Sequence, residues 1–311
     1  MEEGPFDSEQ LERQWWDQLP SVPAVTTVLL RQQNRRRWKP CSLAHMFARF
    51  PRLQEVHYEP WREWEDCFQG LTDRDYLYLF ESIHRLNNNL KRIVVFENFN
   101  QQYPAIRQQF LRRCDLTGCV STRKPAPAVG RIVALASLKL EHLAASYIAD
   151  ASHFFEVEAS WRWPNLTSLV LTSKLLTPDE DPTEIGTMLQ AAAAAAMKMP
   201  QLETMEVWNG RKDLASLFKY QAFRKTQQAT ITWRGPWTLT MEPSVIEAWD
   251  AVMLMYDGWR LNLVQERLDK AAIKSHGDAI HYLMLSGQVL RPISLQQIRM
   301  EQKVMEDMET V

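Results

Sequence analysis

The feature that most limits how this chain can fold is a nine-residue pattern that occurs three times. An apolar residue and a proline come first, and a leucine stands two positions after the proline. Two more apolar residues follow, three and five positions after that leucine. The three copies are Phe50–Tyr58, Trp163–Leu171 and Met199–Val207. Apolar residues that alternate behind a proline and a leucine indicate short strands, each entered through a turn.

The proline makes this pattern specific. Without it, the same apolar spacing also fits Val25/Val28/Leu30, Leu90/Ile93/Val95 and Leu135/Leu138/Leu140, with a weaker copy that ends at Ile231/Trp233. In a chain with 45% hydrophobic residues, that bare spacing is expected about 28 times by chance. The full pattern is expected about 0.6 times, because proline is rare. Three proline-led copies therefore indicate a structural repeat.

Between the strand-like segments, apolar residues recur at helical spacing. Asp181, Pro182 and Glu184 are typical of a helix start, with an N-cap, a first-turn proline and a glutamate three residues after the cap. This helix ends before Pro200. Further helices are marked by Leu43, Met46, Phe47 and Phe50, by Tyr76, Leu79, Phe80 and Ile83 after an N-cap at Thr72, and by Leu214, Leu217 and Phe218.

This alternation predicts an α/β fold in which parallel strands line one face and helices the other, an irregular leucine-rich-repeat-like solenoid. The repeat domain is predicted over residues 25–241, after an N-terminal segment over 1–24, and it ends with strands at 230–233 and 237–241. Residues 242–298 are predicted to form a helical C-terminal cap, with helices around 245–252 and 261–268, and 299–311 a flexible tail. A doubly wound sheet is the competing α/β architecture.

Composition excludes several classes of function. A net charge of -2 argues against a dedicated nucleic-acid binder. The longest helix-like apolar run, Ala191–Ala196, is far shorter than the roughly 20 residues that span a bilayer. Met1–Trp16 carries no apolar run that could act as a signal peptide. Four cysteines without framework spacing indicate a reducing compartment. We therefore expect a cytoplasmic or nuclear protein that binds neither nucleic acid nor membranes.

Motifs for cofactor, metal or catalytic chemistry are weak. No glycine-rich nucleotide loop occurs among the ten glycines. Cys114 and Cys119 favour packed thiols over a zinc site, and His276 and His281, which flank Asp278, favour a helix end over a metal site. The basic run Arg35–Lys39 is either a solvated loop or a nuclear-import or phosphate-binding patch. The sequence predicts no cofactor, no metal and no catalytic residue.

The residues interleaved with the repeat leucines are expected to form the working surface, because they point away from the core of a solenoid. Aromatic side chains among charges of both signs are typical of a protein-binding patch. The candidate residues are Arg31, His57, Glu59, Phe96, Lys139, Glu141, Glu206, Trp208 and Arg234. Replacing Trp208 with Ala should then weaken partner binding with little loss of thermal stability.

Four segments carry a resemblance to a known family. They are Phe96–Asn100 after the strand Leu90–Val95, Asn165–Leu169, Met205–Gly210 and Ala229–Gly235. Together, over residues 45 to 270, the chain resembles an uncharacterised family of filamentous fungi, domain of unknown function 6546. Its members often look like F-box proteins with leucine-rich-type repeats.

The resemblance implies an N-terminal F-box that docks on a ubiquitin-ligase scaffold and repeats that present a protein substrate. Leu19-Pro20 is the dipeptide with which an F-box often opens, but the predicted strand at 25–30 leaves no room for one. The chain is then either truncated or an adaptor-free relative, and a ligase scaffold is a partner only if an F-box is supplied elsewhere. We expect a non-catalytic protein-interaction scaffold. The alternatives are a hydrolase or transferase with an unrecognised site on an α/β sheet, and a structural remnant without a partner.

Overall fold

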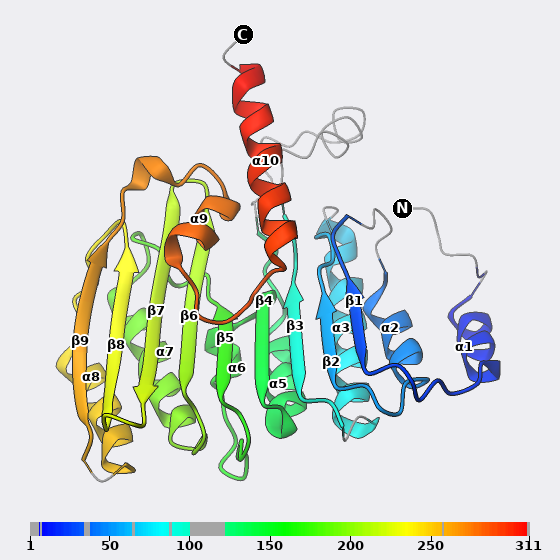
Figure 1. Cartoon of the computed structure of the whole chain (residues 1–311), viewed down its shortest axis with the longest axis horizontal. Helices are drawn as coiled ribbons and strands as arrows, with labels where there is room; N and C mark the ends of the chain where they lie inside the picture. The colour runs from blue at the N-terminus through cyan, green and yellow to red at the C-terminus, as the bar shows by residue number, and fades with distance from the viewer. Residues whose placement is uncertain are drawn as a thin grey trace.

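The computed structural model describes residues 6, 8–33, 38–63, 66–86, 89–99, 122–256 and 258–309, which form a mixed α/β structure around one nine-stranded sheet. The strands stand in the sheet in sequence order, and the sheet is open (Figure 1). They are β1 (Thr27–Leu30), β2 (Glu55–Tyr58), β3 (Arg92–Phe96), β4 (His142–Asp150), β5 (Ser168–Thr172), β6 (Thr204–Arg211), β7 (Leu214–Phe223), β8 (Gln228–Gly235) and β9 (Arg260–Arg267). The helices are α1 (Glu9–Gln18), α2 (Pro40–Phe47), α3 (Asp66–Leu86), α5 (Pro127–Ala136), α6 (Ala151–Phe154), α7 (Pro182–Ala196), α8 (Pro243–Leu254), α9 (His276–Leu283) and α10 (Pro292–Glu309), with short 3-10 turns η2 (Ser137–Lys139) and η3 (Lys270–Ala272).

The sheet is mostly parallel. Strands β1 to β6 all run parallel, β7 lies antiparallel between β6 and β8, and β9 is again parallel to β8. Helices α2, α3, α5, α7 and α8 lie behind the sheet in Figure 1, and α9 lies in front of it. We call the face that these five helices cover the back face, and the opposite face the front face. Each face has its own cluster of buried apolar side chains.

The three proline-led repeats each lead into a strand as predicted, because β2, β5 and β6 begin inside them. The strand register joins equivalent repeat positions into one column, from Val56 to Ile93, Leu143, Leu169 and Met205. All five side chains are at most 2% exposed and belong to the back-face cluster. The repeat spacing therefore identifies the residues of each strand that pack beneath the back-face helices.

One repeat was predicted at the wrong place. Leu135 and Leu138 lie in α5 and η2, and the strand of this repeat is β4, which begins at His142. The true copy starts at Leu140, and Leu143 and Ala145 follow it at the repeat spacing and are buried. Leucines three residues apart also fit one side of a helix, so this spacing alone did not separate the two structures.

Strand pairing overrides helical spacing at two further sites. The segment 214–218, predicted to be a helix, lies in strand β7. The segment 261–268, also predicted to be a helix, lies in strand β9 except for residue 268, which follows the strand. Strand β7 pairs along its length with β6 after a two-residue turn in which Asp213 has a φ of 62°, and β9 pairs along its length with β8. The strand predicted at 237–241 does not form. Trp237 instead packs against Trp233, with ring centroids 4.6 Å apart.

Helix boundaries were predicted with mixed success. Asp181 caps α7 as expected, since its Oδ1 accepts from the backbone N–H of Thr183 at 2.9 Å. Thr72 is no cap, because α3 begins at Asp66. Its hydroxyl donates within the helix to the carbonyl oxygen of Phe68, 3.4 Å away. The predicted flexible tail is helical as far as Glu309, the end of α10.

Candidate protein-binding face

The structure places most of the predicted binding residues on the front face, namely Arg31, His57, Glu59, Phe96, Glu206, Trp208 and Arg234. Lys139 and Glu141 do not lie there, because the repeat begins at Leu140 rather than Leu135. Lys139 is in η2 and Glu141 precedes β4, where its carboxylate pairs with the ammonium of Lys91 at 2.8 Å. Ala144 and Ser146 occupy the front-face positions of this repeat, opposite Val94 and Phe96.

The front face is covered by the end of the chain itself. We call residues 268–298 the C-terminal strap; it comprises η3, α9 and the first turns of α10, and it crosses in front of the sheet in orange and red (Figure 1). Its apolar side chains are Ile273, Ala279, Ile280, Leu283, Val289, Leu290 and Ile298. They form one cluster with Val94, Phe96, Val170 and Trp208 of the strands. Phe96 and Trp208 are 0% exposed, so both are core side chains rather than surface contacts.

Aromatic rings fill the centre of this cluster. Tyr147 packs edge-on against Phe99 and Trp208, with centroids 4.6 and 5.3 Å away. His276 of α9 lies 4.5 Å from Phe99 and stacks on Phe96 at 6.2 Å. Burial lowers the pKa of His276 to about 3, so this histidine is a neutral packing group. No group of three or more His, Cys, Asp or Glu that could hold a metal ion occurs among the described residues.

Glu59 anchors the strap at the start of α10. Its carboxylate accepts from the backbone N–H of Arg291 at 3.0 Å and from the hydroxyl of Ser294 at 2.7 Å. The backbone N–H of Gln32 donates to the same group at 3.2 Å. Glu59 is 4% exposed. A carboxylate at a helix N-terminus satisfies free N–H groups and interacts favourably with the helix dipole, so this charge holds α10 in place.

Glu206 anchors the loop between α9 and α10. Its two oxygens accept from the backbone N–H groups of Ser286 at 2.7 Å and Gly287 at 3.0 Å, and the side chain is fully buried. Lys219 on the neighbouring strand balances the charge at 3.9 Å. Gly287 passes so close to the sheet that an added Cβ would lie 2.4 Å from Cγ2 of Val170. The strap therefore needs glycine at this position.

Arg234 and His57 also bind within the chain. The guanidinium of Arg234 pairs with Glu266 and donates to the carbonyl oxygen of Leu283 at the end of α9. A cation is favourable there because the last carbonyl groups of a helix are negative. His57 is buried, with Nε2 2.7 Å from Oε1 of Glu55. Three of the predicted binding residues, Glu59, Glu206 and Arg234, thus bond to the strap.

Buried charged side chains also follow the carboxyl ends of β2 and β3, namely Arg62, Glu63 and Glu97. The guanidinium of Arg123 contacts Glu97 at 3.0 Å and also pairs with Asp73. Burial disfavours the Arg123 charge, but Glu97, Tyr76 and Asp73 outweigh this effect and raise its pKa. Arg123 therefore joins Asp73 of α3 to Glu97 at the end of β3.

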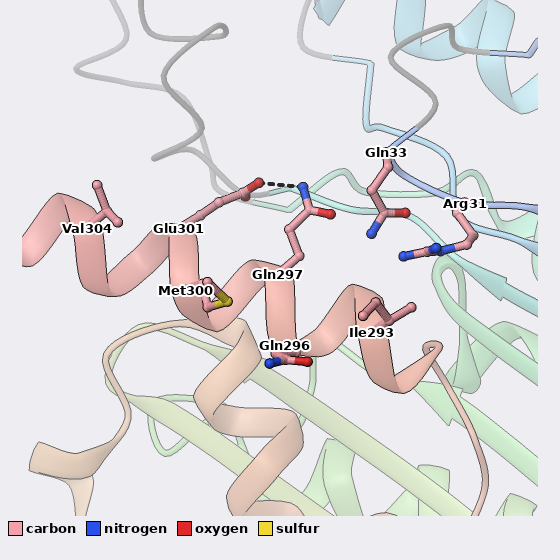
Figure 2. Close-up of a pocket in the computed structure, with 8 residues that line it drawn as sticks. All are labelled: Arg31, Gln33, Ile293, Gln296, Gln297, Met300, Glu301 and Val304. Carbon is pink, nitrogen blue, oxygen red and sulfur yellow. Dashed lines mark hydrogen bonds between the residues drawn. The ribbon is translucent and has the colours of Figure 1, made fainter.

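An open groove remains exposed at the upper edge of the strap. Its volume is about 630 Å³, and its lining is Arg31, Gln33, Ile293, Gln296, Gln297, Met300, Glu301 and Val304 (Figure 2). Three apolar side chains of α10 project there, with Ile293 54%, Met300 60% and Val304 56% exposed. Arg31 borders the groove from the end of β1, and its Nε lies 3.4 Å from the hydroxyl of Ser294.

Sequence reasoning missed the strap residues that bond to the strands of the front face. Arg291, Ser294, Ser286 and Gly287 follow no repeat and carry no motif. A signal was present on the strands, because a carboxylate such as Glu206 between Met205 and Val207 needs a partner once the sheet is covered. Two further candidates lie largely outside the described residues. Of the basic run at 35–39, only Trp38 and Lys39 are described, and the pair Cys114 and Cys119 lies outside the described residues altogether.

The fold and this face define a mixed α/β protein whose open sheet is covered on one side by helices and on the other by its own C-terminal strap. The chain belongs to the Family of unknown function DUF6546, whose model matches residues 85–291. Neither the search of the curated proteins nor that of the solved structures gave a match. No described helix combines the length and the apolar character needed to span a bilayer.

Proposed function

We propose that this chain is a non-catalytic protein-interaction scaffold of the leucine-rich-repeat-like solenoid type, derived from an F-box-type substrate receptor of a ubiquitin ligase and acting in the cytoplasm or nucleus. Support for the solenoid comes from the column of equivalent repeat positions from Val56 to Met205 and from the helices gathered on the back face (Figure 1). Such repeats commonly present an extended surface to another protein.

The observation that carries this proposal is the exposed apolar row on α10. Ile293, Met300 and Val304 are each more than half exposed on a helix whose start is fixed by the buried Glu59. A rigid apolar helix face beside a groove fits an amphipathic helix of a partner protein. Arg31 at the rim favours a partner helix that carries a carboxylate at that end. Of the residues first predicted, Arg31 lines this groove, and Glu59 holds the start of α10.

The test is differential capture from cell extract, with the same substitution made at two exposed methionines. Met300→Asp places a charge in the groove, and Met197→Asp places one on the back-face side at the end of α7, where Met197 is 40% exposed. We expect a specific set of proteins to bind the wild type and Met197→Asp but not Met300→Asp. Capture of the same proteins by all three would refute the groove as the binding surface. Ligase subunits in the specific set support the receptor origin, and their consistent absence counts against it.

A hydrolase or transferase is the second candidate, favoured by the charged groups at the carboxyl ends of β2 and β3, where α/β enzymes place their sites. The scaffold proposal predicts that Glu97→Gln lowers stability by disrupting the pair with Arg123 and leaves capture at the groove unchanged. An enzyme would require a carboxylate there to be released from its ion pair when substrate binds. Loss of a measured hydrolytic activity in Glu97→Gln, with folding intact, would favour the enzyme.

A further inference from the structure

The last strand of the sheet has an open edge. Strand β9 pairs with β8 over eight residues and is the last strand in the order of the described sheet. The strand at the other end, β1, has only four residues. Long edge strands are usually blunted by charged side chains, especially lysine, by proline or by a bulge. Strand β9 contains neither lysine nor proline, its charged residues Arg260, Glu266 and Arg267 lie near its two ends, and its pairing with β8 shows no shift of register.

The backbone of β9 offers its free hydrogen-bonding groups at known positions. The N–H of Leu268 donates to the carbonyl oxygen of Gly235 at 2.9 Å. Successive residues of a strand direct these groups to opposite sides, so the even-numbered residues of β9 face β8. The N–H and C=O groups of Leu261, Leu263 and Gln265 therefore point to the open edge. Leu263 and Val264, in the middle of this edge, are 47% and 38% exposed.

We propose that two copies of the chain associate through their β9 edges, antiparallel about a two-fold axis at Leu263. In this register, Leu263 lies opposite Leu263 of the second copy, and Leu261 lies opposite Gln265. These odd-numbered residues exchange the backbone hydrogen bonds. One continuous sheet then runs through both copies, and the exposed leucines cover each other.

Opposite charges on the two copies favour the register centred on Leu263 over the register centred on Val264. Centring on Leu263 brings Arg260 opposite Glu266 of the second copy, and the two-fold axis repeats the contact. Arg260 is exposed, and no ion pair joins it to another residue that the structure describes. Glu266 is held on the front face by Arg234. Both residues are even-numbered, so their side chains share a face at a non-hydrogen-bonded pair, where side chains lie closest. Centring on Val264 would instead place Glu266 opposite Asn262 and lose both ion pairs.

The test is the molar mass of the full chain in solution, measured by sedimentation over a wide concentration range. We expect a wild-type dimer that Arg260→Glu or Glu266→Arg alone weakens about tenfold or more, because each reversal creates two like-charge contacts. An equimolar mixture of these two variants should dimerise again, since both pairs then have opposite charges. Arg52→Glu, the same charge change at an exposed loop residue, should leave the dimer intact.

A second substitution distinguishes loss of association at the β9 edge from loss of folding. Leu263→Lys places two ammonium groups on the two-fold axis and should give a monomer that melts as the wild type does at concentrations where the wild type is dissociated, whereas Leu29→Lys on the β1 edge should remain a dimer. Leu29 is similarly exposed, at 42%. A monomeric wild type, a dimer that survives Leu263→Lys, or a mixture of the charge variants that stays monomeric would each overturn the proposal.

Discussion

The two faces of the sheet are covered by segments that reach them in different ways. Each of the helices α2, α3, α5, α7 and α8 lies in the sequence between two strands that it covers. The strap comes from the far end of the chain, and its bonds join residues as distant as Glu59 and Ser294, 235 positions apart. Closing so long a loop costs chain entropy that buried contacts must offset. The front face therefore depends on a few specific contacts, whereas the back face depends on many local ones.

The largest expected effect tests whether the front face is a core of the same kind as the back face. Trp208 and Trp163 are both 0% exposed, on the front and back respectively. We expect Trp208→Ala and Trp163→Ala each to lower the free energy of unfolding by about 3–5 kcal/mol in urea denaturation. Trp15→Ala, at a side chain 43% exposed, should cost less than about 0.5 kcal/mol. A small loss in Trp208→Ala together with lost partner binding would restore Trp208 as a surface contact.

The next effect concerns the charge that holds the loop between α9 and α10. Glu206→Ala removes the charged acceptor of the N–H groups of Ser286 and Gly287, and losing these two charge-assisted hydrogen bonds should cost about 2–3 kcal/mol in urea denaturation. Hydrogen exchange at these two amides should rise more than exchange in α7. Glu203→Ala, at an exposed residue that precedes the same strand, is the control. Equal protection of the loop in both variants would contradict an anchoring role.

His276, which packs in the front-face cluster, should make the stability of the fold depend on pH. Burial lowers the pKa of His276 to about 3, whereas an unfolded histidine titrates near about 6.5. Between these values the unfolded chain binds the additional proton, so acidification destabilises the fold by about 1.4 kcal/mol per pH unit from this group. We expect urea denaturation to show a shallower loss below pH ~6.5 in His276→Phe than in the wild type. Parallel curves would show that His276 is already protonated in the folded state.

The smallest effect compares two glycines. Gly287→Ala should cost about 1 kcal/mol or more, because the new methyl group meets Val170 and the strap must shift. Combining it with Val170→Ala should recover part of that loss. Gly70 lies in α3 with nothing within 4 Å of an added Cβ, so Gly70→Ala should stabilise by up to about 1 kcal/mol. Thermal melting of the three variants gives the comparison, and a stabilising Gly287→Ala would show that the strap is loosely seated.

Predictions from the sequence were most accurate where local pattern and long-range packing agree. Leu53, Leu166 and Leu202 are all buried as the proline-led repeats required, and Asp181 caps α7. They were wrong where the same apolar spacing suits a helix and a strand, as at Leu135 and at 214–218. Pairing with a neighbouring strand decided those segments, and a single sequence does not show which neighbour is present.

By itself, the sequence determined the alternation of strands and helices along the repeats and which strand residues turn toward the back-face helices. These properties depend on spacing within about ten residues of chain, which side-chain geometry converts directly into a buried face. Only the tertiary structure decided what covers the front face. Trp208 and Glu206 have the residue types of a binding surface. Because the strap covers them, Trp208 is a core side chain and Glu206 is an anchor for the strap. That outcome depends on the contacts of Glu206 and Glu59 with the strap, which span 80 to 235 residues and for which no local periodicity exists.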